Sequence, residues 1–147
     1  LLDSPVLYLS RYIIQHKKEY YDGLLAVTTN AAWEPWVLFM IEAVRDTAIW
    51  TTAKIVAIRD LLDETAERMR RDLAKIYSRE LAETIFVHPY CRISDLVDTG
   101  IAKRQAASTY LKALVEHGIL REVEAGREKL YTNPALLSLL STRGQSS

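Results

Sequence analysis

The chain has 147 residues, and its 19 Lys and Arg residues balance 19 Asp and Glu residues at a formal net charge of zero. Hydrophobic residues make up 49% of the sequence, which is enough for a packed core, and the length suits one ordinary domain or two small ones. The longest apolar run, residues 36–41, is too short to span a bilayer, and no secretory signal opens the chain. These features argue against a membrane protein, and the single cysteine of the chain fits a reducing, cytoplasmic setting.

The charge is distributed unevenly along the chain. Residues 1–84 carry 11 Lys and Arg against 13 Asp and Glu, whereas residues 85–147 carry 8 against 6. This mild asymmetry permits nucleic-acid binding by the second half without requiring it.

In chain order, the first part of the sequence predicts two helices. Apolar residues recur at helical spacing up to residue 25, a polar break follows at residues 27–32, and a second apolar face begins at Trp33. We expect Gly23 to mark local fraying of the first helix and Asn30 to cap the second. The apolar positions are Leu7, Ile13, Ile14, Tyr20, Tyr21, Leu24, Leu25, Trp33, Trp36, Val37, Met40, Ile41 and Val44.

A long helix is predicted next. No Gly or Pro occurs between Thr47 and Leu81, and strong helix formers are plentiful there. An apolar residue repeats every seven positions, but the residues between these positions are too mixed for a coiled coil. We therefore expect the helix to pack on a neighbouring element, or on its copy in a homodimer. The repeat consists of Ile55, Leu62, Met69 and Ile76.

The sequence from residue 78 onward predicts a helix, a short helix, a glycine turn and a longer helix. The first helix begins near Ser78 and ends before His88-Pro89, because proline disfavours the helical conformation in the residue before it. The short helix covers residues 93–97, Gly100 forms the turn, and the longer helix covers residues 102–116.

A β-hairpin follows the longer helix, which Gly118 ends. Its strands are predicted at residues 120–123 and 129–132, around a turn that contains Gly126. A last short helix begins at Asn133-Pro134. This order of elements is typical of a winged helix-turn-helix domain, and the fold class is predicted to be mainly α. The predicted domains are a helical part at residues 1–77, the winged helix-turn-helix at 78–140 and a flexible tail at 141–147.

Two segments carry a family resemblance. Residues 5–25 read PVLYLSRYIIQHKKEYYDGLL, and residues 33–44 read WEPWVLFMIEAV. They resemble the part of Fic-family proteins, the protein adenylyltransferases, that directly follows the catalytic motif. Residues 78–140 are similar to the winged helix-turn-helix tail of one bacterial branch of that family. Because the chain opens at Leu1 without an initiator Met, we expect it to be the C-terminal fragment of such a protein, with a helical remnant of the Fic core.

The resemblance implies an activity for the parent protein and none for the chain alone. The parent would transfer AMP from ATP, with Mg²⁺, to a hydroxyl group of a target protein. The family motif reads roughly HPFxDGNGR, and only His88-Pro89 resembles it here. The acid and the Gly-Asn-Gly phosphate cradle do not follow, so we assign no catalytic residue, metal ligand or cofactor to this chain.

The remaining reactive and aromatic residues have structural interpretations. Cys91 is the only cysteine, so it forms no internal disulfide or cysteine-based metal site, and we expect it to be a small core residue. Aromatic residues at helical spacing are usually core, and the resemblance implies that they support the helices that carry the active-site loop. It leaves open that Tyr20 or Tyr21 lies near the nucleotide pocket of the whole protein. The aromatic residues concerned are Tyr20, Tyr21, Trp33, Trp36 and Trp50.

A nucleic-acid interface is the main candidate site. The second helix of a helix-turn-helix lays its N-terminal residues in the major groove of DNA, and the hairpin lies near the adjacent backbone. The alternative is a row of ordinary solvated charges, since acidic residues on the hairpin would repel phosphate. The candidate DNA-binding residues are Lys103, Arg104, Gln105, Ser108, Thr109, Arg127 and Lys129, and the opposing acids are Glu122, Glu124 and Glu128.

Several functions therefore remain open. The winged helix binds DNA, or it serves as a scaffold that contacts protein, next to a missing N-terminal Fic core. A second hypothesis is a transcriptional regulator fragment whose helical half dimerises and whose winged helix binds an operator. A third is a structural homodimer built on the long helix. The sequence does not identify the target protein of the parent.

Overall fold

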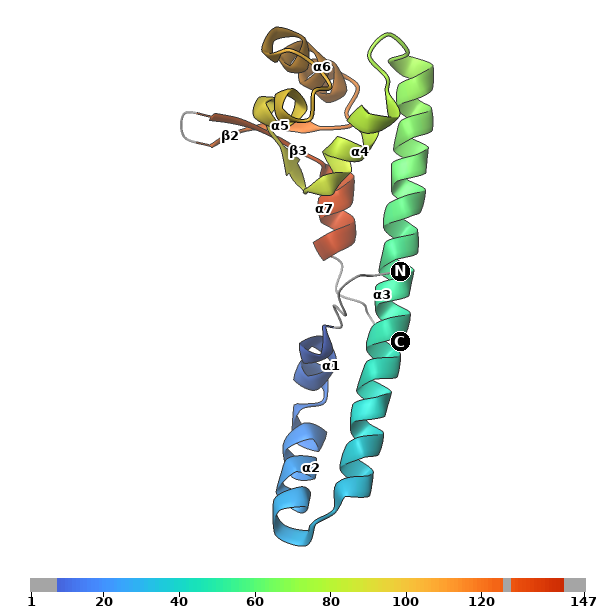
Figure 1. Cartoon of the computed structure of the whole chain (residues 1–147), viewed down its shortest axis with the longest axis vertical. Coiled ribbons are helices and arrows are strands. Elements are labelled where there is room, and N and C mark those ends of the chain that lie inside the picture. Colours follow the sequence, from blue (N-terminus) through green and yellow to red (C-terminus); the bar gives the residue numbers. More distant parts are fainter. Residues whose placement is uncertain (1–7, 126–127, 142–147) are drawn as a thin grey trace. The chain divides into compact units, whose positions relative to one another are not determined.

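The computed structural model describes residues 8–125 and 128–141 (Figure 1). Leu7, Gly126, Arg127 and the predicted tail after residue 141 lie outside the described residues. The elements are α1 (Leu9–Gln15), α2 (Lys17–Asn30), α3 (Trp33–Asp72), α4 (Arg79–Val87), β1 (Tyr90–Cys91), α5 (Ile93–Asp98), α6 (Arg104–Glu116), β2 (Arg121–Ala125), β3 (Glu128–Thr132) and α7 (Pro134–Ser141). The predicted mainly α fold, with a long helix and a small hairpin, is confirmed. Within the described part of the chain, no helix combines the length and apolar character needed to cross a bilayer.

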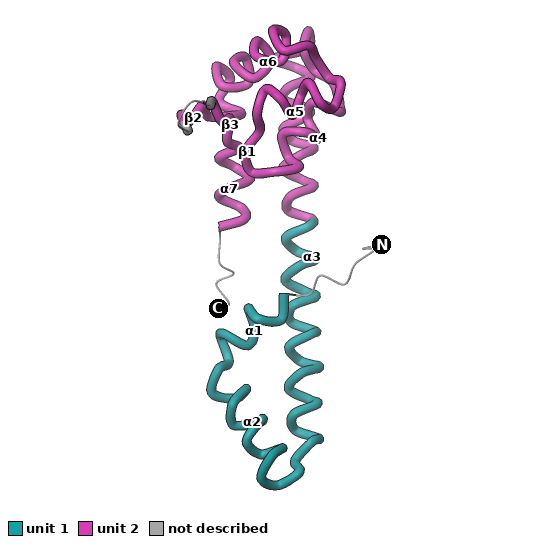
Figure 2. Tube along the Cα trace, turned by 60° about the vertical axis from the view of Figure 1, so that its left-hand side comes forward, with its two compact units in different colours: residues 1–55 teal, residues 56–147 magenta. Residues whose placement is uncertain are grey.

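The chain divides into two compact units, unit 1 at residues 1–55 and unit 2 at residues 56–147 (Figure 2). The boundary falls inside α3, which is a single helix from Trp33 to Asp72. The division at residue 77 that the sequence suggests stays a prediction.

In unit 1, an aromatic cluster packs α1 and α2 against the first part of α3. The ring centroids of Tyr20 and Trp36 lie 5.2 Å apart, and those of Tyr12 and Phe39 lie 5.6 Å apart. Gly23 lies inside α2 against this cluster, because a Cβ atom added to it would meet Cε3 of Trp36 at 2.9 Å. The prediction of fraying at Gly23 is therefore wrong, and the glycine instead allows α2 and α3 to approach closely.

The junction between α2 and α3 also differs from the prediction. Asn30 is the last residue of α2 rather than the cap of α3. Ala31 then takes a left-handed conformation with φ of 51°, and its N–H donates to the carbonyl of Val27 at 3.0 Å. The left-handed region is normally occupied by glycine at helix ends, so no sequence signal marks this turn.

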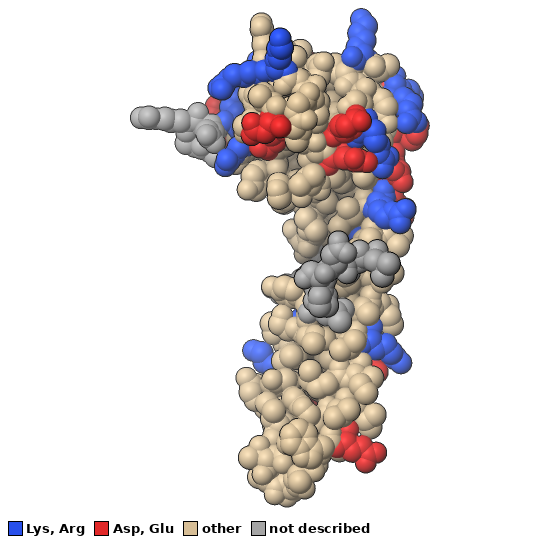
Figure 3. Space-filling model, viewed as in Figure 1, with Lys and Arg blue, Asp and Glu red and all other residues tan. Residues whose placement is uncertain are grey.

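Some aromatic residues that were expected in the core are exposed. Trp33 is 61% exposed and Tyr21 is 64% exposed, whereas Tyr20, Trp36 and Trp50 are half-buried. In the view of Figure 3, uncharged atoms dominate the surface of unit 1. Helical spacing correctly identifies one apolar face on these helices, but the described residues of unit 1 do not cover it.

Unit 2 has a hydrophobic core to which α3, α4, α5, α6 and the sheet all contribute. This core partly explains the seven-residue repeat of the long helix, because Met69 is fully buried in it and Leu62 packs against it. The end of α3 therefore packs on a neighbouring element, as predicted. The buried core residues are Ala66, Met69, Leu81, Ala82, Ile85, Cys91, Leu96, Ala107, Leu111, Leu114, Ile119, Leu120 and Tyr131.

The ends of the helices in unit 2 follow the local sequence signals. Ser78 caps α4, since its Oγ accepts a hydrogen bond from the N–H of Leu81 at 3.1 Å. His88 is extended, with φ of −132° and ψ of 156°, and α4 ends directly before it. Gly118 ends α6 with φ of 67°. These predicted boundaries are confirmed.

The sheet contains one strand that the sequence did not predict. β3 lies between β2 and β1, and both pairs are antiparallel. β1 has only two residues, so it shows no alternation that a sequence could reveal. Cys91 of β1 pairs with Tyr131, and the Asn133 N–H donates to the Pro89 carbonyl at 3.0 Å. Residues 89–91 thus connect α4 to the hairpin.

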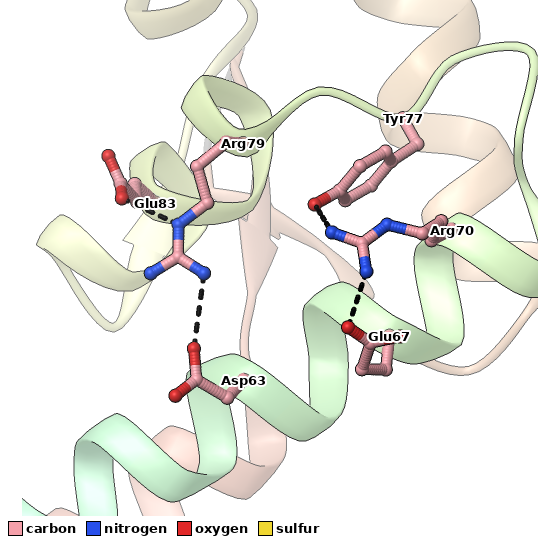
Figure 4. A network of polar contacts seen from close by, with 6 residues as sticks. All are labelled: Asp63, Glu67, Arg70, Tyr77, Arg79 and Glu83. Atoms are coloured by element: carbon pink, nitrogen blue, oxygen red, sulfur yellow. Dashed lines mark hydrogen bonds and ion pairs between the residues drawn. The ribbon is translucent and has the colours of Figure 1, made fainter.

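Polar contacts join α3 to α4 and to the segment before it on the surface of unit 2 (Figure 4). The guanidinium of Arg79 donates to Asp63 at 3.1 Å and to Glu83 at 2.7 Å. Arg70 donates to the hydroxyl of Tyr77 at 2.9 Å. Exposed pairs of this kind contribute about 0–1 kcal/mol each, so the buried side chains, rather than this network, hold α3 and α4 together.

Cys91 lies in the core as predicted, and its thiol is expected to be unreactive in the folded chain. Burial first, and then the charge of Asp95, raises the pKa of Cys91 to about 12. At about pH 8 its thiolate fraction should be lower than that of an exposed cysteine by a factor on the order of 10³. Modification by a disulfide reagent, followed in native buffer and in denaturant, measures this difference. Similar rates in both conditions would contradict the buried position.

Met69→Ala is expected to lower the free energy of unfolding of unit 2 by about 2–5 kcal/mol, because it leaves a cavity in the core. Met69 is 0% exposed. The matched control is Met40→Ala, since Met40 is half-buried in unit 1. Hydrogen exchange of the α6 amides reports on unit 2 alone. Equal loss of protection in both variants would contradict the placement of Met69.

Candidate functional site

The position of α6 is set by the turn that precedes it. Gly100 has a φ of 75°, a conformation that favours glycine. The N–H of Ala102 donates to the carbonyl of Leu96 at 3.2 Å, which ties the turn back to α5. Leu111 and Leu114 of α6 are completely buried. Because one face of α6 is held in the core, its first turn and opposite face are presented to solvent.

The first turn of α6 carries three of the predicted site residues. Lys103 is the N-cap residue, Arg104 and Gln105 follow it, and all three are exposed. The helix begins at Arg104, two residues later than predicted. No acidic residue lies in this turn. Free N–H groups at a helix N-terminus and the helix dipole both favour an anion there, so the cations and the backbone act in the same direction.

The two hydroxyl residues one turn later are placed less favourably for a ligand. The Oγ1 atom of Thr109 donates to the carbonyl of Gln105 at 3.1 Å, so its proton is used inside the helix. Ser108 is half-buried beside the buried Ala107. Thr109 is exposed and keeps acceptor capacity.

The hairpin contributes one described cation to the candidate site. Lys129 lies on β3, and its Nζ forms an ion pair with Oε1 of Glu122 on β2 at 2.6 Å. The hydrogen bond to Glu122 raises the pKa of Lys129. The charge of Lys129 is therefore partly compensated within the hairpin. Arg127, the second predicted cation of the hairpin, lies outside the described residues.

A surface hollow of about 510 Å³ brings two predicted residues together, Arg104 of α6 and Lys129 of β3. It adds Arg92, which precedes α5 and whose guanidinium lies 5.8 Å from the ring centre of Tyr90. Asp98 is the acid in the lining. Lys103, Gln105, Ser108 and Thr109 are not part of the described lining. The full lining is Arg92, Ile93, Ser94, Val97, Asp98, Arg104 and Lys129.

Arg92 and Ser94 were not predicted as site residues. They are 12 and 10 positions away from Arg104 in the chain, and only the fold brings them to the same hollow. The order of elements alone could have suggested Ser94, because it lies in the first turn of α5. Arg92 has no such signal, because its place depends on the unpredicted strand β1.

Charge on unit 2 is mixed rather than uniformly basic. In Figure 3, Lys and Arg side chains (blue) project from unit 2, and Asp and Glu side chains (red) lie between them. A mixed surface gives weaker long-range attraction to a polyanion than a continuous basic face does. Any binding of an anion must therefore depend on local geometry, such as that of the hollow.

His88 directly follows the end of α4, as its interpretation as part of a helix-breaking His-Pro pair predicted. Its ring stacks near that of Tyr90 with centroids 6.2 Å apart. In residues 8–125 and 128–141, no group of three or more His, Cys, Asp and Glu side chains is arranged to hold a metal ion. His88 thus belongs to the short connection between α4 and β1.

Comparison with known protein families gives a match over residues 61–136. The matched family is described as "Protein adenylyltransferase SoFic-like, C-terminal domain". The match covers more than half of the chain, runs from the last part of α3 into α7, and includes every described residue that lines the hollow. This chain therefore belongs to the SoFic-like family of Fic protein adenylyltransferases and contains their C-terminal domain.

Proposed function

We propose that the chain is the C-terminal part of a Fic-family adenylyltransferase and that its α4–β3 region is a winged helix-turn-helix that binds DNA. The observation that carries the proposal is the first turn of α6, where Lys103, Arg104 and Gln105 are exposed and no acidic residue lies in the same turn. Arginine and lysine suit phosphates and the edge of guanine, and glutamine suits adenine. α5, the Gly100 turn, α6 and the β2–β3 hairpin follow one another in the order of that domain.

The chemistry of the parent protein would be carried by residues outside this chain. A hydroxyl oxygen of the target protein would attack the α-phosphorus of ATP, with Mg²⁺ bound to the phosphates, and pyrophosphate would leave. The family motif for this reaction needs a histidine base, an acid and a glycine-rich cradle for phosphate. The sequence of this chain contains no such segment, so we propose a binding or regulatory role for it in a bacterial, cytoplasmic enzyme.

Unit 1 is proposed to pack against the catalytic Fic core of the parent. Its exposed apolar residues include Trp33, Leu38 and Ile41, which are 61%, 59% and 58% exposed. All three lie on α3, and Ile41 also lines an apolar hollow of about 280 Å³ together with Trp36, Val37, Met40 and Val44. Contiguous apolar surface on a folded unit usually marks a protein interface. A homodimer is the alternative occupant.

A protein-contact role for the winged helix is the main alternative to DNA binding. The observation that favours it is the acidic character of β2, where Glu122 pairs with Lys129 and Glu124 is exposed. Affinity for DNA rises with the number of phosphates that are neutralised, and these acids reduce that number. If the apolar face of unit 1 instead joins two copies of the chain, the protein fits a dimeric transcriptional regulator. Sedimentation would detect the dimer.

The isolated chain is expected to transfer no AMP, because it has no motif for the reaction. The measurement is an incubation with Mg²⁺, ATP labelled at the α-phosphate and candidate target proteins, followed by detection of labelled protein. A full-length family member serves as the positive control. Label transfer that persists through rigorous purification of the chain would contradict this proposal.

Lys103→Ala and Arg104→Ala are each expected to weaken binding to duplex DNA and to lower the slope of log K against log salt by about 1. Arg127→Ala tests the turn of the hairpin in the same way. The matched control is Lys75→Ala, which removes one exposed cation between α3 and α4. A gel-shift titration over a range of salt concentrations measures both quantities. Binding without salt dependence, and unaffected by these changes, would favour the protein-contact role.

A further inference from the structure

We propose that the hollow between α5, α6 and β3 is a phosphate subsite, in which Arg104 and Lys129 hold one phosphate group and Glu122 competes with that phosphate for Lys129. This inference deepens the proposed function and rests on it for the source of the phosphate, the backbone of duplex DNA. The hollow itself, with its lining residues, stands on geometry.

The lining offers donors from separate elements to one ligand. Arg104 forms no hydrogen bond or ion pair with any described residue, so its fork of N–H donors is available to an oxyanion. Lys129 spends one donor on Glu122 and has two more. Arg92 adds positive charge next to them, and Asp98 is the acid among the described lining residues. A volume of about 510 Å³ lies within the range of small-ligand sites.

Phosphate fits this set of donors better than a carboxylate does. The lining combines two guanidiniums, an ammonium and the N-terminal turn of α6, and these are the groups that recur around phosphate. Ser94 adds a hydroxyl that makes only a long contact, 3.4 Å, with Asp95. Ile93 and Val97 give the hollow an apolar wall on one side.

Glu122 is the group that competes with a phosphate for Lys129. It pairs with Lys129 at 2.6 Å while the two side chains are 28% and 50% exposed. Ion pairs with this exposure are weak and easily exchanged. A phosphate that already contacts Arg104 can therefore replace Glu122 as the partner of Lys129. In the absence of ligand, the pair keeps Lys129 in an ordered position beside the hollow.

Tyr131 provides an alternative partner for Glu122 after the exchange. The two residues face each other across β2 and β3, so their side chains lie on the same face of the sheet. The Tyr131 hydroxyl is buried and has no hydrogen-bond partner among the described residues. Burial first, and then the charge and nearness of the Glu122 carboxylate, raise the pKa of the Tyr131 hydroxyl, while the charge of Lys129 lowers it. Once Lys129 turns to the phosphate, the Tyr131 hydroxyl can donate to Glu122.

The test uses the whole chain and compares three variants. Glu122→Gln removes the competitor and should raise the affinity for duplex DNA by about threefold, the scale of an exposed ion pair. Arg104→Ala should lower the affinity about tenfold. Glu116→Gln is the matched control, because it removes the same charge as Glu122→Gln at the other end of α6. At the helical rise of ~1.5 Å per residue, Glu116 lies about 18 Å from Arg104 along the helix. Fluorescence anisotropy with a labelled duplex measures the three affinities.

A second arm titrates the same proteins with inorganic phosphate and follows the backbone amides by NMR. Saturable shifts at Ser94, Arg104 and Lys129 that tighten in Glu122→Gln support the subsite. If DNA binds and Lys103→Ala weakens it, but Glu122→Gln behaves like Glu116→Gln, the subsite is overturned and the proposed function stands. If phosphate shifts these amides and DNA does not bind, the subsite stands for a free phosphate compound and DNA binding is overturned. No binding in either arm overturns both.

Discussion

Burial of one face of α6 is the constraint on which the candidate site depends. Leu111 and Leu114 have no exposed surface, and Leu96 of α5 is equally buried. Because these side chains are fixed in the core, the opposite side of α6 and its first turn, which follows the α5–Gly100 turn, are exposed to solvent. Lys103, Arg104 and Gln105 owe their exposure to this packing rather than to their own preferences. The hollow exists for the same reason, since α5, α6 and β3 meet around a shared core.

The two units differ in how much of their apolar surface they bury. Unit 2 encloses a hydrophobic core among its own elements, and Tyr131, Met69 and Leu81 are fully buried there. Unit 1 has an aromatic cluster but leaves residues such as Trp33 and Ile41 more than half exposed. A domain that encloses its own core is suited to binding and release. A unit with an uncovered apolar face is suited to permanent packing, and this agrees with a structural role for the first half of the chain beside a larger partner.

The sequence predicts those features of the fold that depend on local backbone geometry, and it does not predict those that depend on contacts between distant residues. Ser78, His88-Pro89, Gly100 and Gly118 act through their own backbone geometry, and the elements they delimit were predicted within a few residues. β1 could not be predicted, because it exists only through its pairing with β3. The end of α2 was missed because an alanine, rather than a glycine, occupies the left-handed position. For the site, the cations of α6 were found from their place in a motif, whereas Arg92 joins the hollow only through the tertiary fold.

The position of β2 in the sheet gives its acidic residues a second role. The strand order β1-β3-β2 makes β2 an edge of the sheet among the described elements. An edge strand presents unpaired N–H and C=O groups, and charged side chains on it hinder pairing with a strand from another chain. Arg121, Glu122 and Glu124 all lie on this strand. The acids that weaken attraction to phosphate therefore also protect the protein from association edge to edge. A hairpin selected only for tight anion binding would give up that protection, so solubility and affinity set opposite demands on the same few residues.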